Sequence, residues 1–299
     1  MQIQAVLSEP VIRTRVGILN RTDLPPLAII VGIAIMTLIL EQWIPLRWNI
    51  PAYKFIWPAG ICLAVAAFYS MVRPKPVFQE IGVYLGFWFF FPVLATRLSY
   101  FAACVGMPLR DGLFNAADAA MGFHWVDWVH FLARYPVIVT FLEFVYGSLH
   151  WQPLLIVPVL ALWGPRGRNA EFLTSILFAV LCSIAIFILT PSLGPADSSG
   201  LHAYTAEMTQ LLRAGSVGPY AYSGIVPFPS LHTAMALLYM VAHRNIRFTF
   251  IPFFTLNIAM LIAVPSQGNH YLIDMLAGAV VAALSFIAAR RLHQHLIIS

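Results

Sequence analysis

Charged residues are scarce in this chain. Asp, Glu, Lys and Arg together make up 10% of its 299 residues, against roughly 25% in soluble proteins. Apolar residues make up 60%. So few charges cannot cover the surface of a free cytosolic protein. A disordered chain is excluded too, because disorder requires low hydrophobicity and high charge. The composition therefore indicates an integral membrane protein.

Cysteine is scarce as well. The chain contains Cys62, Cys104 and Cys182, which are an odd number, lie far apart and have apolar neighbours. This pattern indicates neither a disulfide framework nor a zinc site. No cluster of Asp and Glu suited to magnesium occurs beside the candidate catalytic residues below, so we expect metal-independent chemistry without a cofactor.

Long apolar segments predict an all-α, polytopic protein with about eight transmembrane helices, since a bilayer helix needs roughly 20 apolar residues. The expected spans are 26–44, 55–72, 78–103, 131–163, 171–190, 229–243, 248–264 and 270–289. The fourth is over-long and contains Pro136, Pro153 and Pro158, so it is either kinked or begins as an interfacial helix. The sixth is short, and we expect its neighbours to shield it.

The basic residues predict the orientation, because Lys and Arg concentrate on the cytoplasmic side. With these spans, eleven basic residues fall on one side and six on the other. The larger set is Arg13, Arg15, Arg21, Arg73, Lys75, Arg166, Arg168, Arg244, Arg247, Arg290 and Arg291. The smaller set is Arg47, Lys54, Arg97, Arg110, Arg134 and Arg213. We therefore expect the protein in the plasma or inner membrane, with both termini in the cytoplasm and the candidate site on the extracytoplasmic face. The net charge of +5 reflects this bias, so we expect no nucleic-acid partner.

The two longest connections, 104–130 and 191–228, are then expected on the extracytoplasmic side. Residues 109–128 carry Leu109, Leu113 and Met121 at helical spacing. This spacing predicts an amphipathic helix at the membrane interface, with an ordinary surface loop as the alternative.

The first polar motif is 227–233, Pro-Phe-Pro-Ser-Leu-His-Thr. Ser230 is a good N-cap and proline favours a helix start. His232 then falls in the first helical turn, where free N–H groups and the helix dipole favour an anion.

The second motif is 265–274, Pro-Ser-Gln-Gly-Asn-His-Tyr-Leu-Ile-Asp. His270 and Asp274 are four residues apart and share one helical face. The carboxylate can accept from one imidazole nitrogen and leave the other as a nucleophile or base.

Both histidines are expected at the outer ends of their helices, where they can meet. His270 would attack phosphorus, and His232 would protonate the leaving oxygen and later act as base. Alternatively, each of these side chains is a packing or hydrogen-bonding residue, although ionisable groups at membrane depth are usually functional.

The sequence resembles the type 2 phosphatidic acid phosphatase superfamily. Pro229 to His232 is similar to its P-S-x-H element, and His270 with Asp274 to its H-x-x-x-D element. The resemblance implies a six-helix core over 78–299, with 1–77 adding an N-terminal segment and two further helices. It also implies a phosphohistidine on His270, oriented by Asp274, with His232 as the acid. The His-Tyr-x-x-Asp form resembles the inositol phosphorylceramide and sphingomyelin synthase branch.

The chain departs from the family pattern where a phosphate-binding arginine is expected. Ala263 and Val264 stand in place of the family's Ser-Arg, and the K-x6-R-P element is not recognisable. Other groups must then hold the phosphate, and several have equally ordinary roles as snorkelling or capping residues. The candidates are Arg213, Arg97, Arg134, Ser230, Ser266, Gln267 and Asn269.

Three functions remain open. The first is a lipid phosphotransferase, moving a phosphate-containing head group from a phospholipid to a lipid or alcohol acceptor. The second is a phosphatidate or polyprenyl phosphate phosphatase that uses the same residues with water. The third is a non-enzymatic lipid transporter, in which Glu143, His232, His270 and Asp274 form a proton or substrate path. For Glu143 with Tyr146 we favour a structural bond across helices. The segment 190–195 either lines the site or simply ends a helix.

Overall fold

A computed structural model of the chain describes residues 19–44, 46, 53–196, 201–215 and 224–298. These residues form twelve α-helices and two short 3-10 helices, with no strand. The α-helices are α1 (Leu24–Trp43), α2 (Tyr53–Met71), α3 (Pro76–Cys104), α4 (Asp111–Ala120), α5 (Trp125–Ala133), α6 (Pro136–Gly147), α7 (Gln152–Trp163), α8 (Arg168–Leu189), α9 (Leu201–Arg213), α10 (Leu231–Ala242), α11 (Arg247–Gln267) and α12 (Leu272–Ile298). The 3-10 helices are η1 (Arg21–Asp23) and η2 (Ser148–His150).

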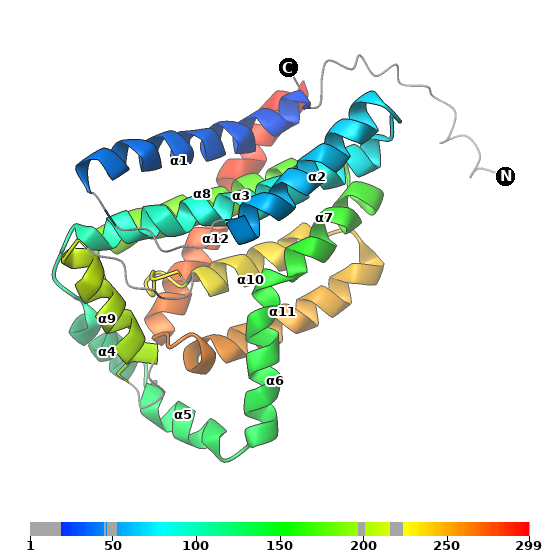
Figure 1. The fold of residues 1–299 in the computed structure, drawn as a ribbon. Helices are drawn as coiled ribbons and strands as arrows, with labels where there is room; N and C mark the ends of the chain where they lie inside the picture. Colours follow the sequence, from blue (N-terminus) through cyan, green and yellow to red (C-terminus); the bar gives the residue numbers. More distant parts are fainter. Residues whose placement is uncertain (1–18, 45, 47–52, 197–200, 216–223, 299) are drawn as a thin grey trace.

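The predicted all-α polytopic architecture is confirmed. Within the described residues, six helices are long and apolar enough to cross a membrane: α1, α2, α3, α8, α11 and α12. They match six of the eight expected spans. The short α10 lies against α8, α11 and α12 (Figure 1). Its 12 residues extend about 18 Å at 1.5 Å per residue, so it relies on these neighbours for shielding, as the sequence predicts.

The expected span 131–163 is not one helix. It is divided among the end of α5, α6, η2 and α7, and the helix axis turns by 116° between α5 and α6–η2. Proline disfavours helical geometry in the residue before it, and Tyr135, before Pro136, has a non-helical ψ of 73°. The expected kink is therefore present, and an interfacial position for the leading helix stays a prediction.

Polar and aromatic contacts join the helices in the interior. Gln152 on α7 and Asn257 on α11 exchange two amide hydrogen bonds, of 2.8 and 3.2 Å. Trp88 on α3 stacks on Phe172 of α8, with ring centroids 5.9 Å apart. These contacts hold α7, α8 and α11 around the buried α10.

Small residues allow two helix pairs to approach closely. Gly82 of α3 faces α2, where an added Cβ would lie 2.6 Å from the Cys62 carbonyl oxygen. Gly278 of α12 faces the start of α10, where an added Cβ would lie 2.3 Å from the carbonyl oxygen of Ser230. Glycine at these positions permits backbone contact between helices in a membrane. The separation of 1–77 from the remaining chain stays a prediction.

We expect Gly278→Ala to destabilise the protein by about 1–3 kcal/mol, as overpacking does, because its methyl group would push α10 away from α12. Thermal unfolding in detergent measures this effect. Gly32→Ala is the matched control, since nothing lies within 4 Å of a Cβ at Gly32. An unfolding temperature of Gly278→Ala at or above that of the control would contradict the prediction.

Candidate active site

The two sequence motifs meet at the starts of α10 and α12. Ser230 is the N-cap of α10, and its Oγ accepts a hydrogen bond from Thr233 N at 3.3 Å. The backbone N–H of Ser230 donates to the carbonyl oxygen of Asp274 at 2.9 Å. A backbone hydrogen bond therefore joins the first turns of the two helices.

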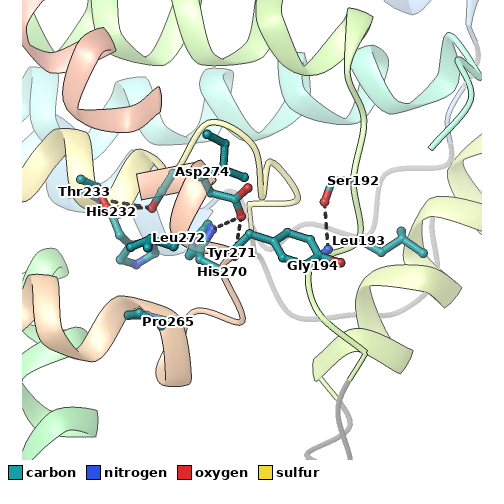
Figure 2. Close-up of polar contacts among 12 residues, drawn as sticks. Ser192, Leu193, Gly194, His232, Thr233, Pro265, His270, Tyr271, Leu272 and Asp274 are labelled. Carbon is teal, nitrogen blue, oxygen red and sulfur yellow. Dashed lines mark hydrogen bonds and ion pairs between the residues drawn. The ribbon is translucent and has the colours of Figure 1, made fainter. Parts of the chain in front are cut away.

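His232 and His270 consequently lie side by side (Figure 2). Their ring centroids are 6.2 Å apart, and the ring planes are inclined by 58°. His270 is only 4% exposed. A single phosphorus atom between the rings could be reached from both imidazoles.

Asp274 orients the His270 ring. Its Oδ2 lies 3.2 Å from His270 Nδ1 and also accepts the N–H of Tyr271 at 2.9 Å. With the carboxylate accepting, the ring proton sits on Nδ1. Nε2 of His270 is then the nitrogen with a free lone pair, as a nucleophile requires.

Tyr146 of α6 holds the His232 ring from the other side. Its hydroxyl lies 3.1 Å from His232 Nδ1, and the two rings stack with centroids 4.1 Å apart. The structural interpretation of Tyr146 with Glu143 misses this contact, because Glu143 is exposed and the Tyr146 hydroxyl bonds to His232 instead. The bend between α5 and α6 and the packing of α6 beside α11 bring Tyr146 to His232, and the sequence does not show either feature.

The N-terminus of α12 is closed by a carboxylate from α4. Asp118 Oδ2 accepts the N–H of Leu272 at 2.7 Å, and Oδ1 accepts that of Ile273 at 2.9 Å. A protein carboxylate therefore occupies the N-terminus of α12, where a substrate anion could otherwise bind. At α10 the N–H groups of Leu231 and His232 have no partner among the described residues.

Sequence reasoning missed Asp118. The signal was present: Phe114 and Asp118 are four residues apart, and both face the protein interior on α4. An acidic residue on the buried face of an amphipathic helix requires a partner. The partner, however, is 154 residues away along the chain.

Several polar atoms at the site have no partner within the described part of the chain. They are buried, and they include His232 Nε2 and both amide atoms of Asn269. Buried polar groups normally make hydrogen bonds. These atoms are therefore available to a bound substrate.

The segment after α8 forms one wall of the site. Asp111 Oδ1, at the start of α4, accepts from Ser192 Oγ, Leu193 N and Gly194 N at 2.9, 2.9 and 3.1 Å. Gly194 has a φ of +84°, and a Cβ there would lie 2.3 Å from the carbonyl oxygen of Asn269. Of the two readings of 190–195, the structure favours a segment that borders the site.

A cavity of about 580 Å³ opens next to this wall. Its lining mixes polar and apolar residues and contains carboxylates but no Lys or Arg: Asp111, Gly112, Asn115, His124, Trp125, Val126, Asp127, Pro195, Ala196 and Tyr271. The Tyr271 ring extends toward Gly194 (Figure 2). Burial and then the charge of Asp111 raise the pKa of the Tyr271 phenol above its usual value, so this hydroxyl stays protonated.

The three candidate phosphate-binding arginines do not converge on the histidine pair in the structure. Arg97 forms a 3.0 Å ion pair with Glu41 of α1. Arg213 donates to the carbonyl oxygen of Met107 at 2.8 Å. Arg134 is exposed at the end of α5. Their role in phosphate binding stays a prediction.

The neutral candidates are distributed differently. Ser230 is engaged in capping α10, and Ser266 Oγ donates to the carbonyl oxygen of Ala263 at 3.3 Å. Gln267 is the last residue of α11. Asn269 is the one with a buried amide left unpartnered among the described residues.

Comparison with known proteins gives one match. A family profile described as the PAP2 superfamily matches residues 113–288, from α4 into α12. No curated protein and no solved structure matches the chain. The matched segment contains Asp118, Tyr146, His232, His270 and Asp274.

Proposed function

Because the chain belongs to the PAP2 superfamily, whose domain supports phosphatase or phosphotransferase activity on lipid phosphates, we propose that it is a membrane lipid phosphotransferase. It moves a phosphate-containing head group from a phospholipid donor to a lipid or alcohol acceptor through a phosphohistidine. The observation that carries this proposal is the pair of adjacent imidazoles whose nitrogens face different partners.

In the first half-reaction His270 Nε2 attacks phosphorus, and the bond from phosphorus to the leaving oxygen breaks. His232 gives its Nε2 proton to that oxygen. This role needs the neutral tautomer protonated on Nε2, which the Tyr146 hydroxyl favours by donating to Nδ1. Loss of the proton leaves an imidazolate, and the same hydrogen bond stabilises its negative charge until the acceptor proton arrives. Asp274 stabilises the positive charge that develops on the His270 ring.

In the second half-reaction the acceptor oxygen attacks phosphorus, and the bond from phosphorus to His270 Nε2 breaks. His232 Nε2, which now carries a lone pair, takes the proton of the acceptor hydroxyl, and His232 returns to its starting state. Proton and phosphoryl group are thus both balanced over the cycle. The chemistry uses imidazoles as nucleophile and acid–base, and so it calls for no metal.

The phosphate charge is held by neutral donors close to the histidines. The open N–H groups of α10 at Leu231 and His232 lie at the positive end of a helix dipole. The unpartnered amide of Asn269 adds a side-chain donor. Arg97, Arg134 and Arg213 remain candidates for longer-range attraction of the anionic lipid.

The cavity beside Tyr271, the residue next to His270, supports transfer to an alcohol over simple hydrolysis. Its volume of about 580 Å³ leaves room for an acceptor far larger than water, whose share of liquid volume is about 30 Å³. The His-Tyr-x-x-Asp form, similar to that of inositol phosphorylceramide and sphingomyelin synthases, supports the same reading. Lipid phosphate hydrolysis is the second candidate, because water can enter the same space.

The helix directions support an extracytoplasmic site. The ends opposite the histidines carry a ring of basic residues: Arg73, Lys75, Arg166, Arg168, Arg244 and Arg247. Because basic residues concentrate on the cytoplasmic side, this distribution supports an extracytoplasmic location for the histidines. Arg13, Arg15 and Arg47 of the sequence count lie outside the described residues.

The first test compares the purified wild type with His270→Ala on a panel of lipid phosphates and phospholipids, with and without alcohol acceptors. We expect a new lipid that appears only with acceptor and requires His270, because the phosphoryl group must pass through its Nε2. His295→Ala is the control, an exposed histidine at the other end of α12.

His270-dependent release of inorganic phosphate without acceptor would instead identify a phosphatase. Turnover retained in His270→Ala would contradict both enzymatic functions. So would the absence of both products combined with lipid movement across vesicle membranes that depends on His270. The second result is the one expected of a transporter.

Tyr146→Phe tests the assignment of the His232 tautomer. Loss of one hydrogen bond of about 0.5–1.5 kcal/mol should lower kcat about 2- to 13-fold, while KM should change little because the hydroxyl bonds to His232. Tyr135→Phe, at an exposed position, is the control. Equal kcat in the two variants would show that Tyr146 does not orient His232.

Orientation can be measured with reporter fusions. A reporter at the C-terminus should read as cytoplasmic, and one inserted between α4 and α5 as extracytoplasmic. The reverse assignment of both reporters would overturn the proposed location of the site.

A further inference from the structure

The first turn of α12 depends on α4 for its cap. The residue before Leu272 is Tyr271, which is not a capping residue, and the Asp274 carboxylate turns back to Tyr271 N and His270 instead. Asp118 receives the next two N–H groups. Its side chain is only 2% exposed, so water does not compete for these bonds.

We propose that Asp118 is a positioning residue for the reaction at His270. It grips Leu272 and Ile273, which lie between His270 and Asp274 in the chain. Movement of this turn would shift the nucleophile and the carboxylate that orients it. The assignment rests on the proposed function, because it is this chemistry that requires His270 to be held in place.

The charge of Asp118 supports this role. The first turn of a helix carries a positive partial charge that stabilises an acidic side chain. At α12 this charge is taken by two carboxylates, Asp118 and Asp274. A substrate phosphate is then favoured at the open start of α10, beside His232.

The first residue of α4 also holds the backbone near His270, through the 192–194 segment. That residue, Asp111, holds Ser192, Leu193 and Gly194, and Gly194 packs on Asn269. Figure 1 places α4 beside the start of α12, and the two helices are in contact. One short helix therefore holds the backbone on both sides of His270.

The kinetic test uses Asp118→Ala and Asp118→Asn. We expect Asp118→Ala to lower kcat by about 10- to 100-fold with KM nearly unchanged, since displacing reacting groups by about 1 Å costs about 10²-fold. Asp118→Asn keeps one acceptor oxygen and should recover part of the loss. Leu113→Ala, on the exposed side of α4, should stay within about twofold of wild type.

A double-variant cycle separates positioning from general destabilisation. If Asp118 acts through the His270–Asp274 pair, Asp118→Ala should reduce kcat by less than about threefold in an Asp274→Asn background, because coupled residues are not additive. The proposal would be overturned if the fold-reductions in kcat of the two single variants simply multiplied in the double variant. A kcat of Asp118→Ala equal to that of Leu113→Ala would overturn it as well.

Hydrogen exchange provides a readout that does not depend on activity. In Asp118→Ala, amide exchange should accelerate in peptides covering 268–276 and stay as in wild type over 231–242, with Asp118→Asn between the two. Unchanged exchange over 268–276 would overturn the positioning role whatever the enzyme does. Accelerated exchange in a protein whose wild type transfers and hydrolyses no lipid phosphate would instead leave the cap standing and refute the proposed function.

Discussion

The close approach of the starts of α10 and α12 is the constraint on which the site depends. Ser230 donates its backbone N–H to Asp274, and Gly278 lets the helix backbones touch. These contacts involve main-chain atoms, so they fix the spacing of the two histidine backbones independently of the side-chain rotamers. The 6.2 Å separation of the rings follows from this packing.

Carboxylates, rather than cations, organise the surroundings of the histidines. Asp274 orients His270, Asp118 closes α12, and Asp111 gathers the turn after α8. Each accepts backbone N–H groups that would otherwise be unsatisfied in a low-dielectric environment. This arrangement differs from the arginine-based phosphate grip implied by the family resemblance. It leaves the N–H groups of Leu231 and His232 at the start of α10 without a partner among the described residues, which is where we propose that the phosphate binds.

Ion pairs outside the histidine site join helices of the bundle. Arg97 is paired with Glu41, which joins α3 to α1. At the opposite end Arg244 of the α10–α11 connection pairs with Glu171 of α8. In each pair the attraction between opposite charges offsets part of the cost of removing them from water. The basic residues at that end also bear on the orientation of the protein in its membrane.

The sequence by itself determined the membrane class, the six long helices and the residues of both histidine motifs, because these depend on local composition, helix period and capping residues. It also indicated that His270 and Asp274 share a face, since four residues span one helical turn. It predicted a kink or an interfacial start in 131–163 but not the 116° turn between α5 and α6, and it could not show that Tyr146 and Asp118 reach the site. Those contacts join residues 86 and 154 positions apart, and only the packing of α4 and α6 against α10, α11 and α12 brings them together.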